Sequence, residues 1–251
     1  MYLTKSTLVM GGLKMSDAGS DAPKIVLAAL FITSLITAQL IAVKLLVVPF
    51  PSSVPVVGGS VLVPAGVLAY AVTFFASDCY AELYGRRPAQ LMVNIGFGMN
   101  FVLLALVWMA IAAPGSPAGV DPAAFETVLG LSTNIVIGSL AAYIVSQNWD
   151  VIAFHAIGDR TDGEHLWLRN LGSTGTSQLI DTTIFVGMAF FLVPSALGIG
   201  QALPGGVLLQ LIVGQYIIKL LIALLDTPFV YAMVGYVRSA GLVESRRVTA
   251  D

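Results

Sequence analysis

The chain has 251 residues, of which 57% are hydrophobic and only 10% are charged, and its mean hydropathy is +0.89. A soluble domain carries about 25% charged residues, so this composition excludes an ordinary soluble protein and indicates an integral membrane protein. The formal net charge of −2 says little about partners. The lipid bilayer is the first expected partner, and no nucleic-acid partner is expected.

Continuous apolar runs of about twenty residues, the length that crosses a bilayer as a helix, predict six transmembrane segments. These lie near residues 25–48, 63–84, 89–113, 131–158, 169–194 and 207–237. Because the runs do not alternate between apolar and polar positions, a helical bundle is favoured over a membrane barrel of strands. The predicted fold class is an all-α integral membrane protein, a bundle of six transmembrane helices.

The positions of the cationic residues predict the orientation of the bundle. Ten of the twelve Lys and Arg residues lie in the amino-terminal segment, the second loop, the fourth loop or the carboxyl-terminal tail, and only Lys44 and Lys219 lie inside predicted spans. Since cationic residues gather in cytoplasmic loops, both termini are predicted to be cytoplasmic. The protein itself is predicted to lie in the inner or plasma membrane of the cell. The predicted organisation is a flexible tail at 1–24, the membrane domain at 25–238 and a second tail at 239–251.

Other segments give weaker signals. The first 24 residues lack the apolar stretch of a signal peptide. The first outer loop, residues 49–62, is rich in Pro and Gly but still apolar, so it either folds back over the bundle as a plug or lid or forms a plain surface turn. The third loop, 114–130, could carry a short interfacial helix. A lone cysteine, Cys79, is expected to be a small packing residue.

Polar residues inside the spans are the strongest indication of function. The candidates are, in chain order, Asp78 and Glu82 in the second span, Asn100 in the third, Tyr143, Gln147 and Asp150 in the fourth, Ser177, Gln178, Asp181 and Thr182 in the fifth, and Lys219 and Asp226 in the sixth. A charged group near the bilayer centre costs about 3 kcal/mol. We therefore expect these side chains to converge on an interior cavity.

Asp181 is the most informative of these residues. At about 1.5 Å per helical residue it lies roughly 18 Å from Arg169, near the middle of a hydrocarbon core about 30 Å thick. The excess of acids over cations in the spans favours a cationic or donor-rich ligand, or protons. Glu82, Asp181 and Asp226 are candidates for ion or proton coupling.

Two alternatives stay open from the residues alone. Glu82 is either functional or an interfacial partner for the arginines at 86 and 87. Lys219 either contacts a ligand or forms a structural ion pair with Asp181 or Asp226. No motif of a zinc hydrolase, a nucleophile elbow or a phosphate loop is present, so no enzymatic activity, metal or cofactor is predicted.

These residues together resemble a known family. Four elements carry the resemblance: Asp78-x-x-x-Glu82-x-Tyr84-Gly85 before a basic pair, Arg169-Asn170, Ser177-Gln178-x-x-Asp181-Thr182, and Lys219 with Thr227-Pro228 and Tyr231. They are similar to the queuosine-precursor transporter family, also called the YhhQ or vitamin-uptake-transporter type. The resemblance runs from about Gln39, where an asparagine is expected in the family, to Tyr231. It adds Asn170 to the substrate-binding candidates.

The resemblance implies a six-helix carrier that imports 7-cyano-7-deazaguanine or 7-aminomethyl-7-deazaguanine, a precursor in the queuosine and archaeosine pathways of tRNA modification. An alternative is a substrate-binding subunit of an importer of the energy-coupling-factor type, which would need a separate energising module. The sequence leaves open whether the chain forms a homo-oligomer. Under the first interpretation one carboxylate, such as Asp181, accepts the ring N–H and the exocyclic amine of the base, and Tyr143 covers its flat face.

Overall fold

The computed structural model describes residues 15–54, 58–161 and 166–241. The described elements are the long helices α1 (Met15–Ile41), α2 (Gly66–Tyr84), α3 (Arg86–Ala112), α5 (Ser132–Arg160), α6 (Leu166–Gly187) and α8 (Gly205–Ser239), the short helices α4 (Pro122–Gly130) and α7 (Val193–Leu197), the π-helical turn η1 (Met188–Leu192), and the strands β1 (Leu45–Val54) and β2 (Gly58–Pro64). The protein is mostly helical, as the continuous apolar runs predict. Helix α1 begins at Met15, inside the segment 1–24 that the sequence predicts to be a tail.

Within the described ranges, five stretches are long and apolar enough to cross a membrane. They are Ala22–Ile41, Arg86–Ala112, Pro122–Arg160, Leu171–Leu197 and Gly205–Ser239. Five of the six predicted spans correspond to these stretches. The remaining one is the second predicted span, which forms α2, a helix of 19 residues that contains Asp78 and Glu82. It falls outside this set of five. The number of spans therefore stays a prediction.

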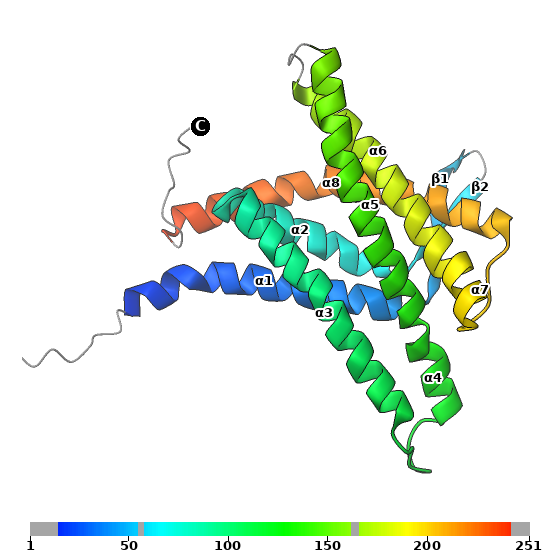
Figure 1. Cartoon of the computed structure of the whole chain (residues 1–251). Coiled ribbons are helices and arrows are strands. Elements are labelled where there is room, and N and C mark those ends of the chain that lie inside the picture. The colour runs from blue at the N-terminus through cyan, green and yellow to red at the C-terminus, as the bar shows by residue number, and fades with distance from the viewer. Residues whose placement is uncertain (1–14, 55–57, 162–165, 242–251) are drawn as a thin grey trace, which may run out of the picture.

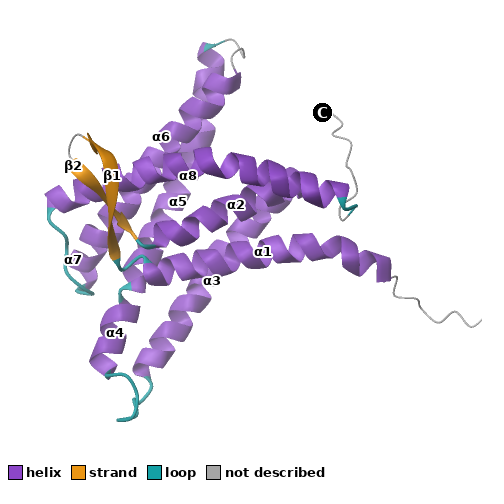
Figure 2. Ribbon diagram, turned by 180° about the vertical axis from the view of Figure 1, so that it is seen from behind, coloured by secondary structure: helices purple, strands orange, loops and turns teal. Residues whose placement is uncertain are grey.

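The long helices form two groups that cross each other (Figure 1). Helices α1, α2 and α8 lie side by side, while α5 and α6 pair along their lengths and pack across them. The start of α1 and the end of α8 lie at one end of the molecule, and the β1–β2 hairpin lies at the opposite end beside the start of α8 (Figure 2).

Two clusters of buried apolar side chains hold the helices together. The first joins α1, α2, the start of α3 and the end of α8, and it includes Phe31 and Leu35. The second joins the turn after α1, α5, α6, η1 and the start of α8, and it includes Ala42 and Phe185. Cys79 is fully buried in the first cluster, as expected for a small packing residue.

The segment 45–64 differs from the sequence prediction, because it forms an antiparallel hairpin rather than a helix end and a loop. Its β-branched valines favour a strand, and Val61 and Val63 are fully buried whereas Val47 on the partner strand is exposed. The pairing is interrupted between Pro49 and Val54, since proline has no N–H to donate to the ladder. The predicted end of the first span at residue 48 is therefore wrong: α1 stops at Ile41, and Lys44 lies in the exposed turn before β1.

The predicted fifth span, 169–194, is interrupted near its carboxyl-terminal end. Helix α6 widens into η1 and continues as α7, because Pro194 cannot donate a hydrogen bond to the carbonyl of Phe190 one turn earlier. That carbonyl instead accepts a hydrogen bond from the backbone N–H of Leu203 at 2.8 Å. The predicted third-loop helix is present as α4, which is capped by the carboxylate of Asp121.

The hairpin packs directly on α8 at Gly214. A Cβ atom at this position would collide with the backbone oxygen of Leu62. Of the two interpretations of the first outer loop, this contact agrees with a segment that folds back over the bundle. We expect Gly214→Ala to destabilise the protein by about 1–3 kcal/mol, the usual cost of overpacking.

Thermal unfolding of the detergent-purified protein would measure this effect. Gly235→Ala is the matched control in the same helix, because a Cβ atom there meets nothing within 4 Å. The control is expected to be neutral or stabilising, since alanine favours a helix by up to about 1 kcal/mol over glycine. Equal melting temperatures for the two variants would contradict the tight contact between hairpin and α8.

Candidate functional site

A cavity of about 180 Å³ lies where the two groups of helices cross. This volume is far larger than the roughly 10–15 Å³ that a single water needs. Helices α1, α2, α3, α5, α6 and α8 all contribute to its wall. The lining residues are Phe31, Leu35, Tyr70, Thr73, Phe74, Ser77, Val93, Phe97, Tyr143, Ser146, Gln147, Gln178, Asp181 and Lys219. We call this space the large cavity.

An ion pair between α6 and α8 is the most strongly polar feature of the large cavity. The Lys219 Nζ atom lies 2.6 Å from Oδ2 of Asp181, and the Lys219 side chain is 5% exposed against 20% for Asp181. The hydroxyl of Ser146 on α5 donates to the other carboxylate oxygen of Asp181 at 3.2 Å. Among the partners that the sequence leaves open for Lys219, the structure therefore pairs it with Asp181. Removing either partner would leave a buried charge uncompensated.

Lys219 also faces an aromatic ring on α2. Its Nζ atom lies 5.7 Å from the centroid of the Tyr70 ring, within the range of a cation–π interaction. The ammonium group is thus held between the carboxylate of Asp181 and the ring of Tyr70. Tyr70 is a cavity residue that was not among the candidates predicted from the sequence.

A flat aromatic wall closes the large cavity on the side of α3 and α5. The rings of Phe97 and Tyr143 stack with centroids 4.0 Å apart and an interplanar angle of 21°. The Tyr143 hydroxyl donates to Oδ1 of Asn94 at 2.8 Å and accepts from Nε2 of Gln90 at 2.6 Å. These contacts fix the ring of Tyr143 in its plane. Gln90 and Phe97 had no distinguishing signal in the sequence, because both lie among the residues of an ordinary apolar helix.

The fourth and fifth predicted spans meet along a polar seam. Ser146 contacts Asp181, and one turn away the hydroxyl of Ser177 on α6 donates to Oδ1 of Asp150 on α5 at 3.3 Å. Gln147 and Gln178 line the large cavity beside this seam. The carbonyl oxygen of the Gln178 side chain is buried and has no hydrogen-bond partner in the described part of the chain. It is therefore an acceptor that a bound molecule can use.

The acids of the second and sixth spans do not converge on this cavity, contrary to the expectation from sequence. Asp78 is exposed on a different face of α2. Positions four residues apart on a helix drift by about 40° per step, so the face that begins at Tyr70 and Phe74 has turned away by Asp78. Asp226 lies on α8, the helix that packs against α2. Both carboxylates lie outside the lining of the large cavity.

Glu82 pairs with an arginine, but not with the ones at 86 and 87 that were its alternative role in the sequence prediction. Its carboxylate lies 2.9 Å from a guanidinium nitrogen of Arg238 at the end of α8, with both side chains more than half exposed. The arginines at 86 and 87 are not its partners in this pairing. Exposed ion pairs contribute about 0–1 kcal/mol, so this contact is a weak link between α2 and α8.

Two of the remaining candidates lie elsewhere. Asn100 and Thr182 are fully buried outside the large cavity, and both amide atoms of Asn100 and the hydroxyl of Thr182 have no partner among the described residues. Asn170 lies in α6, but its side chain is outside the described part of the structure. The cavity thus contains Tyr143, Gln147, Gln178, Asp181 and Lys219 of the predicted set.

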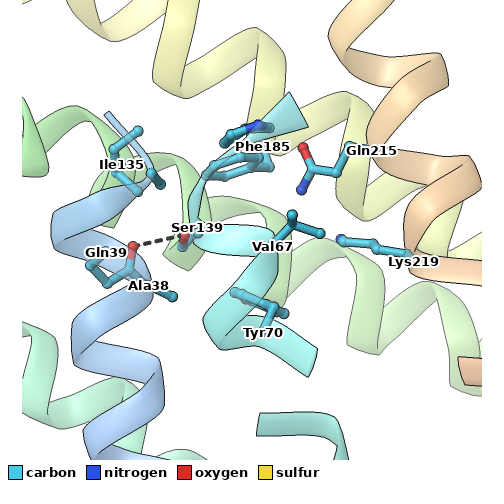
Figure 3. Close-up of a pocket in the computed structure, with 12 residues that line it drawn as sticks. Ala38, Gln39, Val67, Tyr70, Ile135, Ser139, Phe185, Gln215 and Lys219 are labelled. Carbon is cyan, nitrogen blue, oxygen red and sulfur yellow. Dashed lines mark hydrogen bonds between the residues drawn. The ribbon is translucent and has the colours of Figure 1, made fainter. Parts of the chain in front are cut away.

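A second, much smaller cavity adjoins the first. Its volume is about 20 Å³, and it shares Tyr70 and Lys219 with the large cavity. Figure 3 shows Gln39 of α1 and Gln215 of α8 on opposite sides of it, with Val67 between them. We call this space the small cavity. Gln215 was not among the candidates predicted from the sequence, and nothing in the sequence pairs it with Gln39.

Comparison with known proteins assigns this architecture to a family. A family model described as "putative vitamin uptake transporter" matches residues 64–233. The chain is also 35% identical over 168 residues to the "Probable queuosine precursor transporter" of Bacillus subtilis (strain 168), an alignment that covers 66% of this chain and 69% of that protein. No solved structure shows significant similarity. The match to the family model spans more than half of the chain and contains all large-cavity residues except Phe31 and Leu35, so the chain belongs to the vitamin uptake transporter family, a family of membrane transporters and not of enzymes.

Proposed function

We propose that this protein imports a queuosine precursor, 7-cyano-7-deazaguanine or 7-aminomethyl-7-deazaguanine, and binds it in the large cavity. The name of the Bacillus subtilis relative supports a ligand of this class. The observation that carries the proposal is the convergence of Gln178, Asp181 and Lys219 with an aromatic wall in one cavity. A planar base with a polar edge needs these two kinds of surface together.

Asp181 keeps acceptor capacity for a ligand although it already has two partners. An ionised carboxylate offers about four lone-pair sites, and in the structure Lys219 and Ser146 each occupy one. The ring N–H and exocyclic amine of a guanine-like edge can use the remaining two. The unpartnered carbonyl of Gln178, one turn away on α6, is available to the same edge.

The Phe97–Tyr143 wall supports the binding of the flat face. Stacking of a base on an aromatic side chain contributes about 1–3 kcal/mol. Because Gln90 and Asn94 hold the Tyr143 hydroxyl, little side-chain freedom remains to be lost on binding. The ring plane is set before the ligand arrives.

The carrier domain, residues 25–238, lies in the inner or plasma membrane, and the segments 1–24 and 239–251 are cytoplasmic. The distribution of Lys and Arg supports this orientation. The proximity of the start of α1 to the end of α8 supports an even number of crossings. Asp181 is the coupling candidate that lies in the cavity, whereas Glu82 and Asp226 lie outside it.

The test is reconstitution of the purified chain alone. We expect proteoliposomes that contain it to take up labelled 7-cyano-7-deazaguanine or 7-aminomethyl-7-deazaguanine, and we expect riboflavin, biotin and thiamine not to compete. Competition by a vitamin, or absence of deazaguanine binding to the detergent-purified protein, would overturn the proposal. Binding without uptake in proteoliposomes would instead favour a binding subunit that needs a separate energising module.

A further inference from the structure

The small cavity has its own unsatisfied hydrogen-bonding groups. The amide nitrogen of Gln39 and the amide oxygen of Gln215 are buried and have no partner among the described residues. The two side chains are only 1% and 8% exposed. Leaving a buried polar atom unpaired costs about 1–3 kcal/mol, so the N–H groups of Gln39 favour an occupant that accepts a hydrogen bond, and the oxygen of Gln215 favours one that donates.

A hydrogen bond to α5 limits how Gln39 can turn. The hydroxyl of Ser139 on α5 donates to the side-chain oxygen of Gln39 at 3.2 Å (Figure 3), so the N–H groups of Gln39 stay available to an occupant. Gln215 presents both an oxygen and a nitrogen on a terminal amide that can rotate. The small cavity can therefore offer donors from α1 and either a donor or an acceptor from α8.

Size and charge restrict the occupant further. A volume of about 20 Å³ exceeds the roughly 10–15 Å³ needed for one water but leaves no room for a ring. Among the described residues no Asp or Glu lines the small cavity, and Asp181, the partner of Lys219, lines only the large cavity. The small cavity therefore offers no carboxylate to a cationic group. An uncharged group of one or two non-hydrogen atoms that accepts a hydrogen bond fits these conditions.

The position of the small cavity makes it reachable from the ligand site. Tyr70 and Lys219 belong to the walls of both cavities, so these two side chains stand between them. Neither Gln39 nor Gln215 lines the large cavity. A molecule bound in the large cavity would meet the small one only through a narrow projecting substituent.

We propose that the small cavity is a specificity subsite that receives a compact, uncharged, hydrogen-bond-accepting substituent of the ligand. This inference rests on the proposed function. Gln39 and Gln215 contact the substituent, while the large cavity holds the ring system. Among the two proposed precursors, the subsite favours the neutral 7-cyano group over the cationic 7-aminomethyl group.

The test compares three probes on the detergent-purified protein: 7-deazaguanine without a substituent, its 7-cyano derivative and its 7-aminomethyl derivative. We expect the wild type to bind the 7-cyano compound most tightly. Gln39→Leu and Gln215→Leu are each expected to reduce the preference for 7-cyano-7-deazaguanine over 7-deazaguanine by about three- to tenfold, the value of one hydrogen bond. Affinity for the unsubstituted base should stay unchanged. Gln201→Leu, an exposed glutamine outside both cavities, is the control.

A charge-changing variant tests the same subsite by a gain of affinity. Gln215→Glu keeps the shape of the side chain but adds a negative charge, so we expect it to shift preference toward 7-aminomethyl-7-deazaguanine. If the leucine variants weaken all three probes equally or none, and Gln215→Glu leaves their order unchanged, the small cavity holds no substituent and the inference is wrong. A wild type that binds none of the probes would overturn the proposed function itself.

Discussion

Asp181→Asn is expected to reduce uptake of the labelled precursor at least tenfold, towards the background of cells that lack the carrier. The substitution keeps the size of the side chain but removes its negative charge. Hydrogen bonds to a charged group contribute about 1.5–3 kcal/mol, which corresponds to roughly a 10- to 100-fold loss in affinity. The measurement is uptake by cells that cannot synthesise the precursor, normalised to the amount of carrier in the membrane.

A matched acid on the bundle provides the control. Glu82→Gln removes a carboxylate of the exposed pair with Arg238, outside both cavities, and we expect uptake to remain near the wild-type level. Unchanged uptake in Asp181→Asn would remove Asp181 from the proposed mechanism. Equal losses in both variants would show that uptake responds to acids in general and not to the cavity.

The helices of this protein could be predicted from hydrophobicity because each long apolar run has no other low-energy conformation in lipid. The hairpin at 45–64 could not, since Leu45–Val48 resumes the apolar run of α1 with Lys44 as the one charged residue between them. What separates them is the end of α1 at Ile41 and the pairing of residues 45–49 with 60–64. Strand pairing is a contact between segments, and a window that scores hydrophobicity does not detect it.

The candidate site was partly predictable for a related reason. Gln178 and Asp181 stood out because an amide and an acid one turn apart are costly in hydrocarbon. The same argument applied to Asp78, yet that side chain lies on an exposed face of α2. Burial cost identifies a residue that needs a polar environment, but helix rotation decides which environment it meets. The apolar and aromatic residues of the wall, such as Phe97, carry no such cost and gave no signal.

The partner of Lys219 could not be predicted from the sequence either, because two aspartates are within its reach. Asp226 is on α8, the same helix as Lys219, and Asp181 is on the neighbouring helix α6. Helix periodicity puts Asp226 at i+7 from Lys219, close to the same face. The structure nevertheless places the ammonium group against Asp181, at 2.6 Å. The decision depends on how α6 packs against α8, which is a tertiary contact.

Lys219→Met is expected to destabilise the protein by about 3–5 kcal/mol, because it leaves the carboxylate of Asp181 buried without its counter-charge. Methionine keeps an unbranched apolar side chain of similar length, so loss of packing contributes little. Thermal or denaturant unfolding of the purified protein measures the change. We expect the double variant Asp181→Asn/Lys219→Met to recover most of the lost stability, since neither buried charge then remains.

The double variant separates the structural from the functional role of the ion pair. If the pair serves only to hold α6 against α8, restored stability should restore uptake as well. We expect stability to return while uptake stays lost, because the double variant lacks the carboxylate that receives the donor edge of the base. An interaction energy near zero in the double-mutant cycle would contradict the contact between Lys219 and Asp181. Recovery of uptake together with stability would instead show that the charged pair is a structural element, and that the ligand is held by the amides and the Phe97–Tyr143 wall.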